Sequence, residues 1–170
     1  LQHASRTGIG VEISATLARS VIGLGLDEAV AALHPELDKQ HHAVELKRVA
    51  DAYRQHYIYD NDIPAPLFTG VADMLDALRS KGHKLAIATG KSRAGLDHTL
   101  EEHGMTALFD ITRTPTETRS KPDPLMLNEI MTVTGHSTTE TLMIGDSEHD
   151  LRMADNAGVD SIAVTHGVHD

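Results

Sequence analysis

The sequence predicts an α/β protein in which a parallel β-sheet follows an N-terminal helical domain. From about residue 71 onward, short apolar runs alternate with helical patterns, which is typical of parallel strands joined by helices. Before about residue 60, only helical patterns occur. Pro64-Ala65-Pro66 then interrupts the pattern and indicates an extended connector. We therefore expect two domains, residues 1–64 and 65–170.

Helical spacing of apolar residues defines the elements of the first domain. We expect helices over residues 11–18, 26–33 and about 41–57. Asp27 and Glu28 fall in the first turn of the second helix, where acidic side chains interact favourably with the helix dipole. The first domain should therefore be a purely helical unit.

The second domain should contain four strands, each preceded or followed by a helix. The strands are short and apolar, and are expected to be buried between helices on both faces of the sheet. The predicted helices span residues 71–81, 93–103, 124–134 and 148–157, and the predicted strands span residues 85–88, 109–111, 142–144 and 161–164.

Composition excludes several classes of function. The formal net charge is −10, which argues against nucleic acid and anionic membranes as partners, because both require a basic face. The chain has no cysteine, so disulfides, thiolate metal sites and cysteine nucleophiles are excluded. No apolar run approaches the roughly 20 residues of a membrane span. We expect a cytoplasmic protein, either a monomer or a homodimer.

Polar residues that could bind a ligand occur at three places, each just after a predicted strand or just before a predicted helix. Thr89 and Gly90 end one strand, Lys121 precedes a helix, and Asp146 and Asp150 follow another strand. In an open α/β sheet these positions converge at one edge, where ligands bind. A hydroxyl, a backbone amide, an ammonium group and carboxylates that hold Mg²⁺ suit a phosphoryl group. The candidate residues are therefore Thr89, Gly90 and Lys121 for phosphate, with Thr89 and Lys121 also catalytic, and Asp146 and Asp150 for the metal.

These segments resemble motifs of the haloacid dehalogenase superfamily of phosphatases, most closely its phosphoglycolate-phosphatase-like branch. Ala88-Thr89-Gly90 is similar to the second motif, whose hydroxyl binds phosphate. Ser120-Lys121-Pro122-Asp123-Pro124 is similar to the third, whose lysine stabilises phosphate and nucleophile. Gly145-Asp146-Ser147-x-x-Asp150 is similar to the fourth, whose first Asp binds Mg²⁺ and whose second supports the metal site. The resemblance implies a Rossmann-like core with a helical cap.

One family motif is missing from the chain. The family's first motif, an Asp-x-Asp-Gly-Thr run ahead of the cap, carries the nucleophile that becomes an aspartyl-phosphate and a second Asp that acts as general acid/base. Asp60-Asn61-Asp62 is the only near match, and it falls on the connector and lacks the Gly-Thr. We expect that the nucleophile lies upstream of residue 1 and that the family fold continues beyond residue 167. The chain as given should then be inactive.

The resemblance implies Mg²⁺-dependent hydrolysis of a small phosphorylated metabolite. Alternatives are a phosphomutase, or a non-catalytic fragment or module that binds phosphate or ions. A phosphonatase would need a cap lysine in an apolar setting, which neither Lys39 nor Lys47 has. Arg19 and the turn at residues 23–26 lie where such caps often face the site, and they are also consistent with a surface arginine and a simple turn.

Two other short motifs in the sequence lack residues that their function requires. Gly90-Lys91-Ser92 lacks the glycine that a P-loop carries five residues earlier, because that position is Leu85. Gly145-Asp146-Ser147 is shared with a class of serine esterases, which need a histidine to activate the serine, and His166 is the only late candidate. Ser147 is equally suited to capping the helix that follows.

Overall fold

The computed structural model describes residues 1–59, 66–165 and 167. Up to residue 59 it contains helices and one isolated β-bridge. These helices are α1 (Gln2–Ile9), α2 (Ala15–Ser20), α3 (Leu26–Leu33), α4 (Ala43–Arg54) and the π-helical turn η1 (Gln55–Tyr59).

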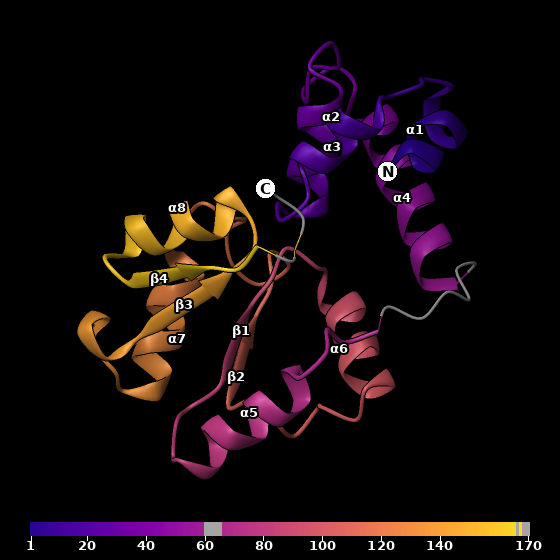
Figure 1. The fold of residues 1–170 in the computed structure, drawn as a ribbon. Coiled ribbons are helices and arrows are strands. Elements are labelled where there is room, and N and C mark those ends of the chain that lie inside the picture. Colours follow the sequence, from indigo (N-terminus) through magenta and orange to yellow (C-terminus); the bar gives the residue numbers. More distant parts are fainter. Residues whose placement is uncertain (60–65, 166, 168–170) are drawn as a thin grey trace.

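The N-terminal helices share two small apolar cores. Ala4 of α1 and Val30 of α3 pack against Val49 and Ala50 of α4, and all four are almost fully buried. A second cluster joins residues of α3 to the segment around α2. Figure 1 shows these helices grouped at one end of the molecule.

The remaining elements alternate between helices and strands, as the sequence predicts. The helices are α5 (Val71–Ser80), α6 (Arg93–Glu102), α7 (Leu125–Thr134), the 3-10 turn η2 (Thr138–Glu140) and α8 (Glu148–Ala157). The strands are β1 (Ala86–Ala88), β2 (Ile111–Arg113), β3 (Leu142–Gly145) and β4 (Asp160–Ala163). β1 pairs with β2 and β3 pairs with β4, both in parallel. The predicted α/β class with parallel strands is confirmed.

The sheet differs from the expectation in one respect. In the described part of the chain, the strands form two separate two-stranded sheets rather than one. Leu142 and Ile144 of β3 and Ile162 of β4 are 52%, 47% and 49% exposed, so one face of that pair is uncovered. The expectation that helices cover both faces of every strand is therefore wrong for β3 and β4.

An apolar cluster joins α7 and α8 to β2. Met126, Leu127, Ile130 and Met131 of α7 pack with Met153 and Ala154 of α8, Ile111 of β2 and Val159. Met126 and Met153 have no exposed surface. Methionine fills irregular gaps well, which suits a core between two helices and two separate strand pairs.

The sequence analysis misplaced the first helix. A helix was expected over residues 11–18, but α1 occupies 2–9 and α2 begins at Ala15. Gly10 ends α1 in the left-handed conformation with φ of 73°, and Ser14 begins α2 by accepting a hydrogen bond from the Leu17 amide. The strands β1, β2 and β4 also begin one or two residues from their expected starts.

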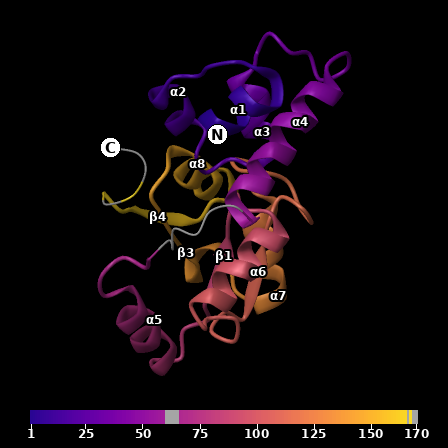
Figure 2. The same ribbon diagram turned by 90° about the vertical axis from the view of Figure 1, so that its right-hand side faces the viewer.

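The carboxyl ends of β1 and β3 both face the N-terminal helices, whereas α5 lies at the opposite end of the molecule (Figure 1). A view turned by 90° shows the same separation between α5 and α1–α4 (Figure 2). The strand ends that carry the candidate residues are therefore covered by the helical part.

Three features of the sequence analysis fall on residues that the structure does not describe. The boundary between residues 64 and 65 and the Asp60-Asn61-Asp62 run lie outside the described residues, as does His166. The division into two domains stays a prediction. Within the described part of the chain, no helix has the length and apolar character needed to cross a membrane.

A buried polar contact joins α1 to the end of α3. Ser5 Oγ lies 2.9 Å from His34 Nε2, and His34 Nδ1 lies 3.2 Å from Glu36 Oε1. Ser5 and His34 are both fully buried. Because a carboxylate can only accept, Nδ1 carries the hydrogen, and in the neutral ring Nε2 accepts from the Ser5 hydroxyl.

We expect Ser5→Ala to lower the free energy of unfolding by about 1–3 kcal/mol, because it leaves a buried ring nitrogen without a partner. Thr7→Ala is the matched control, since Thr7 contacts His3 at the surface of the same helix. Urea unfolding followed by circular dichroism measures both variants. Equal losses in the two variants would show that the buried contact contributes nothing specific.

Candidate active site

A cavity of about 720 Å³ lies between the strand ends and the N-terminal helices. All five candidate residues line it, although they come from three separate segments of the chain. These residues are Thr89, Gly90, Lys121, Asp146 and Asp150.

The first segment is the loop between β1 and α6. The Thr89 amide donates to the carbonyl of Arg113 and so continues the β1–β2 ladder. Thr89 Oγ1 then accepts a hydrogen bond of 3.2 Å from the Lys91 amide, and Ser92 caps α6 by accepting from the Gly95 amide. This bond to Lys91 uses an oxygen lone pair of Thr89 and leaves the hydroxyl hydrogen for another acceptor.

The second segment is the loop that precedes α7. Asp123 accepts from the Leu125 amide at the start of the helix, and Asn156 of α8 donates to the carbonyl of Pro122 at 2.9 Å. Ser120 Oγ accepts from the Gly25 amide at 2.6 Å. The loop that carries Lys121 is therefore fixed from both the core and the N-terminal helices.

Lys121 and Asp150 form a buried ion pair at the floor of the cavity. Lys121 Nζ lies 2.5 Å from Asp150 Oδ1, and the two residues are only 6% and 4% exposed. The other oxygen of the carboxylate, Oδ2, accepts from the Ser147 amide at 3.1 Å and from Ser147 Oγ at 2.7 Å. Both oxygens of Asp150 are thus already hydrogen-bonded.

Burial would raise the pKa of Asp150, but the charge of Lys121 and hydrogen bonds from Lys121 and Ser147 outweigh it, so the pKa lies below its usual range. The carboxylate is therefore ionised at neutral pH. Gly145 makes this arrangement possible, because a Cβ at that position would lie 2.3 Å from Asp150 Cβ.

Asp146 is the other candidate metal ligand that lines the cavity. It directly follows β3, is half-buried and lines the cavity. The described residues contain no group of three or more His, Cys, Asp or Glu side chains arranged to hold a metal. One carboxylate still fits Mg²⁺, which is usually bound by one or two carboxylates plus water and substrate phosphate.

The N-terminal helices reach the cavity through the turn between α2 and α3. A Cβ at Gly90 would lie 2.3 Å from the carbonyl oxygen of Leu24, so this close contact requires glycine. Gly23 and Arg19 also line the cavity. The placement expected for Arg19 and this turn is what the structure has, while their roles stay a prediction.

Residues that no sequence motif indicates line the other side of the cavity. Tyr53 and Tyr57 lie with their rings stacked, with centroids 5.5 Å apart, and Lys91 Nζ donates to Tyr57 Oη at 2.5 Å. Lys91 belongs to the Gly90-Lys91-Ser92 run, which does not match a P-loop. Its position two residues after Thr89 is the sequence feature that would have indicated a place at the cavity.

The structure does not support a serine esterase. Ser147 is 3% exposed, caps α8 and donates to Asp150 rather than to a histidine. Ser147 therefore has a structural role, as the capping alternative predicts.

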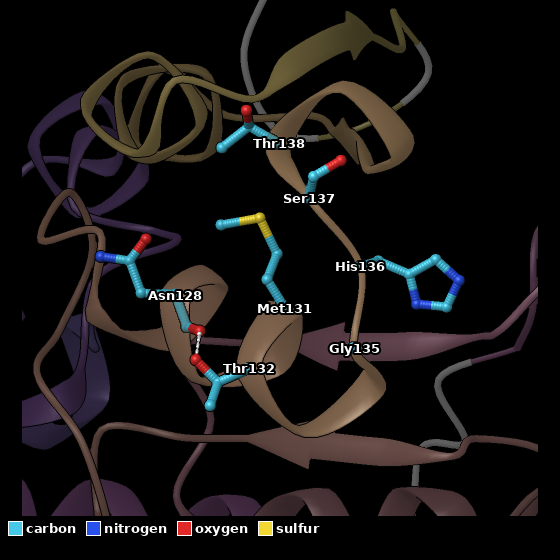
Figure 3. A pocket seen from close by; sticks show the side chains of 7 residues that line it. All are labelled: Asn128, Met131, Thr132, Gly135, His136, Ser137 and Thr138. Carbon is cyan, nitrogen blue, oxygen red and sulfur yellow. Dashed lines mark hydrogen bonds between the residues drawn. The ribbon is translucent and has the colours of Figure 1, made fainter.

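A second hollow of about 410 Å³ lies away from this site (Figure 3). It is formed by the end of α7 and by Ser137 and Thr138, which precede β3, whereas Asp146 follows β3. Met131 points into the hollow and the His136 ring points away from it (Figure 3). The hollow brings no charged group toward a ligand.

We expect Lys121→Met to lower the free energy of unfolding by about 3 kcal/mol, because it leaves the Asp150 carboxylate buried without a counter-ion. Lys84→Met is the matched control, since Lys84 pairs with Asp110 at 3.0 Å on the surface and should lose much less. Denaturant unfolding at neutral pH measures both. Similar losses of unfolding free energy in the two variants would show that the buried pair stabilises the fold no more than the surface pair does.

The lowered pKa of Asp150 predicts a contribution to stability that acid removes. An Asp in the unfolded chain titrates near pH 4. The stabilisation is complete above that pH and is lost as pH falls through the lower folded pKa. In metal-free buffer, the difference in unfolding free energy between wild type and Asp150→Asn should shrink below about pH 4. A difference that grows on acidification would be the opposite of this expectation.

The sequence matches the profile of the haloacid dehalogenase-like hydrolases over residues 2–164. The chain is 34% identical over 157 residues to the probable phosphatase IndB of Dickeya dadantii, covering 89% of this chain and 66% of that protein. It is 31% identical over 170 residues to a phosphoglycolate phosphatase of Vibrio vulnificus, covering 98% and 68%.

The crystal structure of a protein described as a haloacid dehalogenase-like hydrolase, from Bacteroides fragilis, superposes with a TM-score of 0.81 at 26% identity. That match covers 98% of this chain and 80% of the other. The chain spans 66% and 54% of the first two curated relatives, IndB and a phosphoglycolate phosphatase of Aliivibrio fischeri. Because the family profile covers nearly all of the sequence, the chain belongs to the haloacid dehalogenase-like hydrolases.

Proposed function

We propose that the protein hydrolyses the phosphate monoester of a small metabolite with the help of Mg²⁺. The observation that carries this proposal is the convergence of Thr89, Lys121 and Asp146 on one cavity at the strand ends. Relatives named as phosphatases give the proposal its reaction class. Acidic chains can bind phosphate when the cations are local, as Lys121 is here.

Each residue would have a distinct task. The Thr89 hydroxyl and the amides beside Gly90 would orient the phosphoryl oxygens. The Lys121 ammonium would offset the negative charge that builds up on them in the transition state. Asp150 would hold Lys121 in position, because both of its oxygens are already hydrogen-bonded within the protein.

Asp146 would hold Mg²⁺ together with water and substrate oxygens. When bound, the ion supplies positive charge that polarises the phosphoryl group. Asp150 was predicted as a metal residue as well. Its contacts in the structure favour a supporting role behind the metal, and its direct coordination stays a prediction.

The nucleophile would come from a segment ahead of Leu1. In that case an upstream Asp attacks phosphorus, the alcohol leaves with a proton from a second Asp, and water hydrolyses the aspartyl-phosphate. β1 and β3 belong to separate sheets and β3 and β4 have an uncovered apolar face. A further parallel strand between the two pairs would join them into one sheet and bring its own carboxyl end to the cavity.

A phosphatase assay with p-nitrophenyl phosphate and Mg²⁺ tests the proposal. A chain restored upstream should turn over the substrate, and the 170-residue chain should not. Asp146→Asn in the restored chain should reduce turnover by orders of magnitude without unfolding the protein. Asp155→Asn, an exposed acid on the same helix as Asp150, is the control and should retain turnover.

The other outcomes select between the remaining hypotheses. Folded protein without activity in either chain would favour a module that binds phosphate or ions. Turnover by the 170-residue chain would show that the nucleophile has been misplaced. A restored chain that transfers phosphate between sugar hydroxyls rather than to water would be a phosphomutase. The cytoplasmic location and the monomer or homodimer state stay predictions.

A further inference from the structure

The contact between Lys91 and Tyr57 joins the strand-end loop to the N-terminal helices across the cavity. Lys91 Nζ donates to Tyr57 Oη at 2.5 Å and lies 4.6 Å from the centroid of the Tyr57 ring. Tyr57 belongs to the π-helical turn η1, which follows α4 directly. Such turns are frequent at functional sites.

Lys91, Lys121 and Arg54 all line the cavity, but Lys91 differs from the other two in the kind of group that it contacts. Lys121 is paired with Asp150, and Arg54 is paired with Asp27 and Asp51. The Lys91 ammonium donates to a neutral phenol, and among the described residues no carboxylate forms an ion pair with it. A half-buried cation beside a neutral group is suited to receive an anion from a ligand.

The position of Lys91 relative to the phosphate residues indicates which part of a ligand it would meet. Its backbone amide bonds to Thr89 Oγ1, so the phosphate residues and the Lys91 side chain extend from the same short loop. An ammonium group has three N–H donors, of which Tyr57 Oη takes one. Two donors remain for a group attached to a phosphate held at Thr89.

We propose that Lys91 determines substrate specificity by binding a second anionic group of the phosphate ester, with Tyr57 holding the ammonium in place. The substrate class is then a short phosphate monoester that carries a carboxylate or a second phosphate. This inference rests on the proposed phosphatase function, because it takes the Thr89 end of the cavity as the phosphate site.

Three ligands that differ at one end test the proposal by calorimetry on the 170-residue chain with Mg²⁺. Ethyl phosphate carries no second anion, phosphoglycolate carries a carboxylate, and ethylene glycol bisphosphate carries a second phosphate. We expect phosphoglycolate or ethylene glycol bisphosphate, which carry a second anionic group, to bind at least about tenfold more tightly than ethyl phosphate. One charge-assisted hydrogen bond can provide a difference of this size. The better of the two identifies the anion.

Lys91→Met should bring the ratio between the affinity for the better ligand with a second anion and the affinity for ethyl phosphate close to one. Tyr57→Phe should reduce this ratio in part. Lys84→Met is the charge-matched control, because Lys84 precedes β1 at the end opposite the cavity and should keep the ratio. A contact that served only to join the two parts of the molecule would not change a ratio between ligands.

The outcomes separate the two proposals. Binding of all ligands with equal affinity, or a preference that survives Lys91→Met, overturns the role of Lys91 and leaves the phosphate site intact. If no ligand binds to the folded chain, the phosphate site itself is wrong, and the role of Lys91 fails with it.

Discussion

The buried ion pair between Lys121 and Asp150 is the interaction on which the site depends. An ammonium group in a protein interior is stable only if its charge is compensated and its donors are used. Asp150 provides the charge, and Ser147 in turn satisfies the carboxylate through its amide and hydroxyl. The same contacts begin α8, so the end of β3 and the lysine loop are fixed by one set of bonds. Asp146 lies between the end of β3 and Ser147, so these contacts also position Asp146 at the cavity.

The cavity also depends on close backbone contact between the two parts of the chain. The carbonyl of Leu24 approaches Gly90 so closely that no other residue would fit, and the Gly25 amide donates to Ser120 beside Lys121. The turn between α2 and α3 therefore touches both the loop that carries Gly90 and the loop that carries Lys121. A change in this turn would alter the cavity without altering any residue proposed to meet the phosphate.

Local patterns predicted the strand-end residues well, because Thr89, Lys121 and Asp146 each follow from short motifs and parallel strands bring their ends together. They failed for α1, for which no helix was expected, and which is held by the packing of Ala4 against Val49 and Ala50 of α4. They also failed for the pairing of Lys91 with Tyr57, which are 34 residues apart. Such contacts depend on how the helices pack on the core, and local sequence patterns do not indicate this packing. The separation into two strand pairs was likewise invisible, since sequence indicates strands and not their neighbours.

In the proposed function, three separate segments form a single phosphate site. The most direct measurement is a nuclear magnetic resonance titration of the labelled chain with inorganic phosphate and Mg²⁺. We expect the amide shifts to concentrate at Thr89 to Lys91, around Lys121 and at Gly145 to Ser147, and to saturate together. Shifts confined to one of these segments, or centred on the hollow beside Met131, would contradict it.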